Sequence, residues 1–278
     1  MKTKHLRLMQ RAYVILFFCF MYLPIAYMVV FSFNQSKGYA LFTGFTLKWY
    51  TSLLHNESIL HALWVSLYLA LFSAVIATVL GTAASLGIAS MGRKSRLLVT
   101  NITYITTVNP EIITGISLML MFVFVGQMMG LSTSLNFGTI LIAHVTFCLP
   151  FVILQVLPKL RQMDPALPEA AMDLGCPPLK AFLKVEQPEI FPGILTGFIM
   201  AFTLSLDDFV ISYFTTGNGF ETLPIRIYSM TKKTVTPKMY ALATLIFFVI
   251  LILLLLSNLS DRDDKDPARP RARRKLRL

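Results

Sequence analysis

Long apolar runs are the feature of this sequence that most restricts its fold. Several runs of 18 or more residues contain no Lys or Arg, and about 20 such residues in a helix span the hydrocarbon core of a bilayer. In lipid, backbone N–H and C=O groups must be satisfied within the protein, which favours helices. Since 55% of the 278 residues are hydrophobic, the sequence predicts an all-α membrane protein.

Six apolar segments are predicted to form transmembrane helices within residues 12–260. They cover about residues 12–33, 62–89, 97–125, 139–157, 193–216 and 240–259. The first run is longer than the apolar part of a signal peptide and lacks a small-residue cleavage site, so we expect it to remain as a helix. Pro24 lies inside this run, and we expect a kink there.

The positive charges predict the orientation of these spans. Of the 25 Lys and Arg residues, 19 fall in segments that this arrangement places on one side of the membrane, and the other six fall on the opposite side. The positive-inside rule assigns the first side to the cytoplasm. Both termini, residues 1–11 and the charged tail 261–278, are therefore expected to be cytoplasmic. The net charge of +11 is then explained by topology and lipid headgroups rather than by nucleic acid.

A polar loop at residues 158–192 separates the fourth and fifth predicted spans. Its first part predicts a short helix with Glu169 near its positive end and Gly175 at its stop. Pro177-Pro178 then suits the first turn of a second helix. We expect that helix to end at Pro188. Apolar residues on two short polar helices predict docking into a groove of a soluble partner.

Several stretches carry a resemblance to one family. They are Glu169-Ala170-Ala171 with Gly175, Phe33-Asn34-Gln35-Ser36, Phe45-Thr46-Leu47-Lys48-Trp49-Tyr50, the run from His144 to Phe151, and the run from Ser205 to Ser212. With them, the chain resembles ABC-importer permeases of the type I kind, and among these the second permease subunit of spermidine/putrescine importers.

The resemblance implies a division of labour among subunits. This chain would form half of the polyamine pathway in a bacterial inner membrane, next to a second homologous permease, and a periplasmic or extracellular binding protein would deliver the polyamine. A dimer of ATPase subunits would hold ATP and Mg²⁺, and this chain would bind no cofactor. The loop residues that would dock on the ATPase are Glu169, Ala170, Ala171, Gly175, Leu179 and Phe182.

Three acidic residues lie at membrane depth in the predicted spans: Glu111, Asp207 and Asp208. A charged side chain at the bilayer centre costs about 2.5–3.5 kcal/mol on insertion scales. The predicted spans contain no Lys or Arg to offset this cost. Water, a partner subunit or a cationic cargo must do so, and a polyamine, which is a chain of ammonium groups, matches spaced carboxylates with aromatic rings between them. Pro110 also predicts a broken or kinked helix just before Glu111.

Helix geometry separates the two adjacent aspartates. Neighbouring residues point about 100° apart on a helix, whereas Asp208 shares a face with Ser205 and Ser212. We therefore expect Asp208 and Ser205 to line the pathway and Asp207 to face a neighbouring helix. The resemblance to polyamine permeases implies a role in uptake for Trp49, Glu111, Ser205, Asp207 and Asp208.

Simpler explanations compete at each position. A membrane acid can be protonated and bonded to the backbone, Trp49 can be an interfacial anchor, and His144 is expected to be a hydrogen-bonding residue of the packed interior. The three cysteines show neither metal-site nor disulfide spacing.

Alternative functions remain open at this stage. The sequence contains no phosphate-binding G-x-x-x-x-G-K-[ST] motif, so it is expected to be a non-catalytic subunit. The cargo could instead be another cation, an amino-acid derivative or a metal chelate. An intramembrane aspartyl enzyme would need two carboxylates on different helices to meet, and a secondary transporter would show an inverted repeat and no docking loop.

Overall fold

The computed structural model describes residues 2–36, 41–130, 135–164, 166–217, 220–232 and 236–262. These residues form helices and connecting turns, with one isolated antiparallel β-bridge between Asn34 and Phe45. The predicted tail 261–278 lies outside them, except that residues 261–262 end the last helix. The chain divides into two compact units, one of residues 1–61 and 226–250 and one of residues 62–225 and 251–278.

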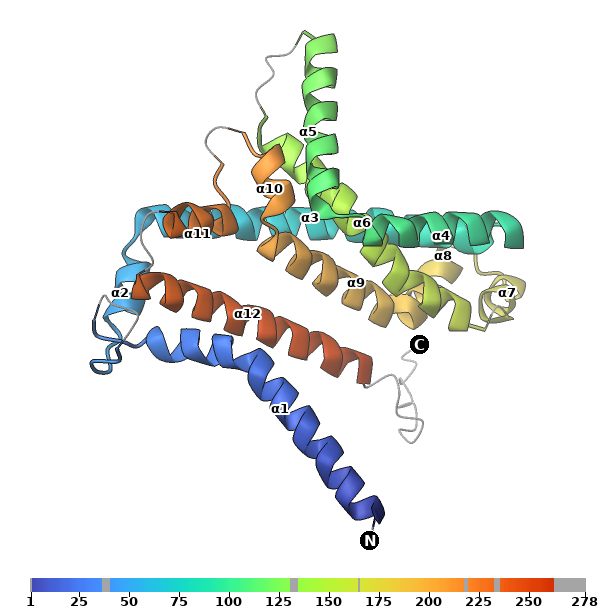
Figure 1. The fold of residues 1–278 in the computed structure, drawn as a ribbon. Helices are drawn as coiled ribbons and strands as arrows, with labels where there is room; N and C mark the ends of the chain where they lie inside the picture. The colour runs from blue at the N-terminus through green and yellow to red at the C-terminus, as the bar shows by residue number, and fades with distance from the viewer. Residues whose placement is uncertain are drawn as a thin grey trace, which may run out of the picture. The chain divides into compact units, whose positions relative to one another are not determined.

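The first unit contains helices from both ends of the chain. They are α1 (Lys2–Phe31), α2 (Lys48–Leu54), the part of α11 (Leu223–Thr231) from residue 226, and α12 (Pro237–Arg262) up to residue 250. The ring of Tyr27 in α1 lies edge-on to that of Tyr240 in α12, with 6.4 Å between centroids. Pro24 lies inside α1, which bends in Figure 1. The helix begins at Lys2 and so includes most of the predicted N-terminal segment 1–11.

The second unit contains the helices from the middle of the chain. It comprises most of α3 (Glu57–Ser90), α4 (Arg93–Val108), α5 (Glu111–Met128), α6 (Phe137–Gln162), α7 (Ala166–Asp173), α8 (Pro178–Ala181), the π-helical turn η1 (Phe182–Glu186), α9 (Gln187–Asp207) and α10 (Val210–Thr215). Helices α6 and α9 pack along each other, and α5 lies beside α10 (Figure 1).

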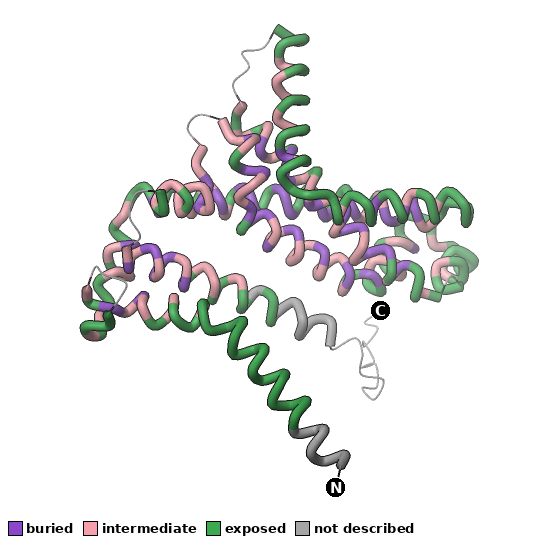
Figure 2. Tube along the Cα trace, in the orientation of Figure 1, coloured by how far each residue is buried: buried purple, intermediate pink, exposed green. Residues whose placement is uncertain are grey.

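Small residues bring α3, α6 and α9 close together. A Cβ added at Gly81 of α3 would lie 2.7 Å from Cγ1 of Val152 in α6, and one added at Gly197 of α9 would lie 3.2 Å from the same atom. The side chain of Val152 is fully buried. Figure 2 shows buried residues along all three helices. This packing of glycine against a branched side chain holds the interior of the unit.

Within the described residues, five helices are long and apolar enough to cross a membrane, with a shorter apolar helix at Pro237–Ile252. The five are Met9–Phe31, Glu57–Ser90, Glu111–Met128, Phe137–Gln162 and Pro178–Asp207. They follow the order of the predicted spans. The third of these helices is α5, because α4 contains several Thr residues and one Asn and ends before Pro110. The fifth helical stretch, Pro178–Asp207, begins before residue 193.

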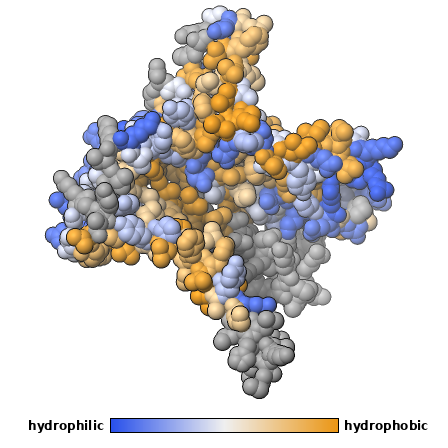
Figure 3. All heavy atoms as spheres, in the orientation of Figure 1, coloured by the Kyte–Doolittle hydropathy of each residue, from blue (hydrophilic) through white to orange (hydrophobic). Residues whose placement is uncertain are grey.

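Large apolar side chains remain exposed on several of these helices. Ile112, Leu120, Phe124 and Met128 of α5 are each more than half exposed, and Figure 3 shows hydrophobic residues gathered on that helix. Apolar side chains of α1 are exposed in the same way. Exposed apolar helix faces of this kind are expected to contact lipid or a partner helix rather than water.

Candidate functional site

The helix that carries the paired aspartates is broken between them. Helix α9 ends at Asp207, Asp208 adopts an extended backbone with ψ of 126°, and α10 begins at Val210. The Asp208 carboxylate accepts the N–H groups of Ile211 at 3.2 Å and Ser212 at 2.7 Å. These N–H groups lie in the first turn of α10 and have no carbonyl four residues earlier within that helix. Asp208 thus stabilises the start of α10.

A buried polar network surrounds this break. The Nδ1 atom of His144 lies 2.7 Å from Oγ of Ser205, and its Nε2 atom lies 3.0 Å from Oγ of Ser212. The same Nε2 atom is 3.5 Å from Oδ2 of Asp208. Oγ of Ser73 in α3 donates to Oγ of Ser205 at 2.9 Å. Four helices therefore share one set of hydrogen bonds, and all five side chains are buried.

A second helix break brings Glu111 to the same region. Asn109 is extended, with ψ of 131°, as expected for a residue before proline, and its Nδ2 donates to Oγ1 of Thr114 at 2.9 Å. Glu111 is the first residue of α5 and is exposed. Helix α5 approaches α10 closely, since a Cβ at Gly115 would lie 3.1 Å from Cδ2 of Phe214. The predicted break at Pro110 is confirmed.

The three acidic side chains lie near one another but differ in burial. Glu111 lies close enough to Asp207 and Asp208 for the like charges to repel one another. Asp207 is exposed, whereas Asp208 and Ser205 are 7% and 3% exposed. The buried pair bonds to groups of α6 and α10, and the role of each of these residues in a pathway stays a prediction.

Trp49 lies in the other unit, where it fixes a loop. Its Nε1 donates to the backbone oxygen of Asn34 at 2.7 Å. The side chain of Asn34 is fully buried, its Nδ2 donates to the oxygen of Leu41 and its Oδ1 accepts the N–H of Thr43. Asn34 thus organises the segment before α2, a role that sequence analysis did not identify. Trp49 and Tyr50 themselves lie in the first turn of α2.

The predicted loop between the fourth and fifth spans forms the expected turn. Helix α7 ends at Asp173, and Gly175 follows with φ of +83°. The N–H of Cys176 donates to the oxygen of Ala171, and that of Gly175 donates to the oxygen of Met172. These two hydrogen bonds define a Schellman motif, whose left-handed position favours glycine.

Several of the predicted docking residues are exposed. Glu169, Ala170 and Gly175 are exposed, Ala171 is half-buried, and Leu179 is 71% exposed. The neighbouring Leu174 is 89% exposed. Two exposed apolar side chains, Leu174 and Leu179, therefore flank Gly175 in the sequence, and their part in docking stays a prediction.

The side chain of Phe182 is half-buried and packs against the core that includes Leu160 and Ile190, and its part in docking stays a prediction. One expectation about this loop was wrong, since the second helix does not end at Pro188. A π-helical turn, in which the N–H of Gln187 donates to the oxygen of Phe182, precedes Pro188 and admits it into the first turn of α9.

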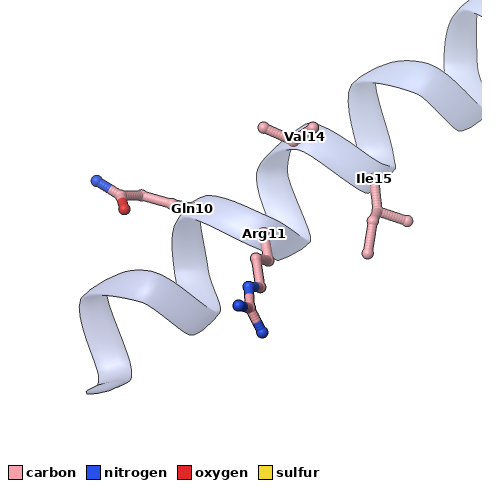
Figure 4. Close-up of a pocket in the computed structure, with 4 residues that line it drawn as sticks. All are labelled: Gln10, Arg11, Val14 and Ile15. Carbon is pink, nitrogen blue, oxygen red and sulfur yellow. The ribbon is translucent and has the colours of Figure 1, made fainter. Parts of the chain in front are cut away.

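One hollow of the described surface is formed by α1. Figure 4 shows this hollow, which is lined by Gln10, Arg11, Val14 and Ile15, all from α1. A single helix cannot enclose a ligand. Within the described ranges, no three His, Cys, Asp or Glu side chains lie close enough to hold a metal ion.

Comparison with known proteins places the chain among transport proteins. Residues 77–263 match the family described as binding-protein-dependent transport system inner membrane component. The chain is 36% identical over 240 residues to the spermidine/putrescine transport system permease protein PotC of Escherichia coli (strain K12), which covers 86% of this chain and 89% of that protein. It is 40% identical over 235 residues to the putrescine transport system permease protein PotI of the same strain, covering 84% and 83%.

Solved structures share the fold at low sequence identity. A chain of a bacterial ABC transporter involved in the import of the acidic polysaccharide alginate superposes with a TM-score of 0.72 at 17% identity, covering 95% of this chain and 97% of that one. A chain of the MetNI methionine ABC transporter gives 0.57 at 17% identity, covering 75% and 96%. The expected all-α importer-permease fold is confirmed. At these identities the likeness shows the fold and not the cargo.

Proposed function

Because the chain belongs to the family of inner membrane components of binding-protein-dependent transport systems, we propose that it forms half of the membrane pathway of an ATP-driven importer for polyamines. As a member, it is a non-catalytic, multi-pass protein of the inner membrane. The finer proposals are the cargo, the coupling to a separate ATPase, and the cytoplasmic location of both termini.

The exposed carboxylates at the two helix breaks carry the proposal for the cargo. Glu111 begins α5 and Asp207 ends α9, and the two interact electrostatically. The sequence has no Lys or Arg between Arg96 and Lys159 or between Lys184 and Arg226. Two negative charges at membrane depth without a basic residue in those stretches favour a cationic cargo over an anionic one. The relatives named for spermidine and putrescine agree with this chemistry.

Exposed apolar residues of the loop support coupling to an ATPase. Leu174 and Leu179 are among the most exposed large side chains of the chain's described part, although Leu174 lies in the Schellman turn and Leu179 in α8. Burying them in a groove of a soluble subunit would be favourable by about 25 cal/mol per Å² of apolar surface. Since α8 continues through η1 into α9, a movement of the docked loop would be transmitted directly to Asp207 and the break at Asp208.

The partners follow from this arrangement. The chain supplies one pathway half, so a second permease is needed, together with an ATPase dimer that binds ATP and Mg²⁺ and a binding protein that delivers the cargo. Contact with membrane lipid is expected along the exposed faces of α1 and α5.

Uptake into proteoliposomes tests the proposal. The chain and its partner subunits are reconstituted with ATP inside, and labelled spermidine is added outside with its binding protein. Putrescine, an amino acid and a metal chelate serve as competitors. We expect ATP-dependent uptake that only polyamines inhibit, and we expect Asp207→Asn and Glu111→Gln to reduce it. If the complex takes up no spermidine but another cargo stimulates its ATPase activity, the polyamine assignment is wrong. The proposed role as a permease would still hold in that case.

A further inference from the structure

The imidazole of His144 contacts the chain on both sides of the break at Asp208. His144 lies in α6 and is fully buried. Its Nδ1 meets Ser205 at 2.7 Å, in the last turn of α9, and its Nε2 meets Ser212 at 3.0 Å, in α10. One rigid ring thus fixes the distance between two helices that no continuous helical backbone connects. The local contacts of the Asp208 carboxylate stabilise α10 alone and do not fix it to α9.

The hydroxyl groups around this ring favour one neutral tautomer. The Ser73 hydroxyl lies 2.9 Å from Oγ of Ser205 and 3.2 Å from the oxygen of Ala70. Where it donates to Ser205, the Ser205 hydroxyl keeps its own proton for Nδ1 of His144. A neutral imidazole then carries its proton on Nε2, which faces Oγ of Ser212 and, at 3.5 Å, the carboxylate of Asp208.

The position of α10 bears on the two exposed carboxylates. Helix α5 packs on α10 at Gly115, where a Cβ would lie 3.5 Å from the Cα of Ile211. Glu111 lies one turn from Gly115 along α5. Asp207, in contrast, is the last residue of α9. The contact of His144 with both α9 and α10 therefore influences how far Asp207 lies from Glu111.

We propose that His144 is a positioning residue of the cargo pathway, which holds the α9–α10 break so that Asp207 and Glu111 keep the spacing that a cationic cargo requires. The transport part of this inference rests on the proposed function. The structural part, that His144 holds the break, can be tested without any cargo.

Three substitutions separate the two contacts of the ring. The amide oxygen of asparagine can take a place close to Nδ1 and accept from Ser205, and the amide nitrogen of glutamine can take a place close to Nε2 and donate to Ser212. His144→Asn should therefore keep the contact to α9, His144→Gln should keep the contact to α10, and His144→Leu should lose both. Cys148→Ala is the matched control. Cys148 is buried one turn further along α6 and contacts Ala201 of α9, and it makes no hydrogen bond to α10 among those described.

Hydrogen exchange of the assembled complex gives the first measurement. The amides of Ile211 and Ser212 should exchange faster by about 2- to 10-fold for each hydrogen bond of His144 that is lost, with His144→Leu the fastest. Peptides from α7 and the Cys148→Ala variant should exchange as in the unchanged complex. Wild-type exchange in all three His144 variants would overturn the inference, as would equal acceleration throughout the second unit. If the His144→Leu variant does not fold, the exchange rates of the His144→Asn and His144→Gln variants still test whether His144 holds the break.

Uptake kinetics give the second measurement. A positioning role should raise the KM for spermidine while the maximal rate stays within about twofold, and His144→Gln should add little in an Asp207→Asn background, because the two changes act through one carboxylate. If the effects of His144→Gln and Asp207→Asn on KM are fully additive, His144 does not act through Asp207. If the unchanged complex takes up no polyamine, the proposed cargo is wrong, and the exchange measurement still decides whether His144 holds the break.

Discussion

Replacing Gly175 by alanine isolates the conformational requirement of the proposed docking loop. Gly175 has φ of +83°, and an added Cβ would meet no atom within 4 Å. The substitution therefore introduces backbone strain without a clash. An L-residue in the left-handed region costs about 1–2 kcal/mol, and Gly175→Ala should weaken the Schellman turn by that amount.

The strain translates into a change in affinity for the ATPase. If docking requires the turn, the apparent Kd between the permease and the ATPase should rise by a factor of up to about 5–30, which corresponds to about 1–2 kcal/mol. Titration of the reconstituted permease pair with the ATPase subunit measures this affinity, and the ratio of spermidine imported to ATP hydrolysed measures coupling. Gly175→Asn should have a smaller effect, because asparagine tolerates the left-handed region.

Gly92→Ala is the control for this experiment. Gly92 also lies at a helix end, with φ of −58° and no atom within 4 Å of an added Cβ, so alanine fits there without strain. We expect wild-type ATPase affinity from this variant. Equal affinity for the Gly175→Ala and Gly92→Ala complexes would refute the requirement for a left-handed turn in docking.

Three further substitutions test other parts of the structure. Gly81→Ala places a Cβ 2.7 Å from Val152 and should destabilise the purified chain by about 1–3 kcal/mol; an unchanged midpoint in thermal unfolding would contradict the packing. Trp49→Phe removes the hydrogen bond to Asn34 and should cost about 0.5–1.5 kcal/mol, seen as faster limited proteolysis before α2, while a purely interfacial Trp49 would show no such change. Leu179→Ala should leave thermal unfolding unchanged but weaken ATPase binding, and unaltered binding would exclude Leu179 from the docking surface.

Local patterns predicted the parts of the fold that depend on neighbouring residues. Proline at position 110 places the break before Glu111 because a proline restricts its predecessor and lacks an N–H. Glycine at position 175 ends α7 because it alone tolerates φ of +83° without strain. The same rules failed at Pro188, where a π-helical turn admits the proline and lets α8 continue into α9.

The break at Asp208 could not be seen in this way. No proline or glycine lies within residues 198–216, and the sequence from Leu206 to Ser212 predicts one apolar helix with two acids. The break exists because the Asp208 carboxylate satisfies the N–H groups of Ile211 and Ser212, and because His144, 61 residues away from Ser205 in sequence, bonds to both sides.

The sequence by itself determined the class of protein, the order of the apolar helices and the turn at Gly175, because hydropathy, charge distribution and glycine or proline preferences act over one or two turns of chain. Only the tertiary structure decided which acid is buried and which is exposed. Asp207 and Asp208 have the same chemistry and adjacent positions, and what separates them is the set of partners that α3, α6 and α10 bring to Asp208 and its neighbour Ser205. Such partners come from distant parts of the chain, and their placement depends on packing between helices rather than on any local pattern.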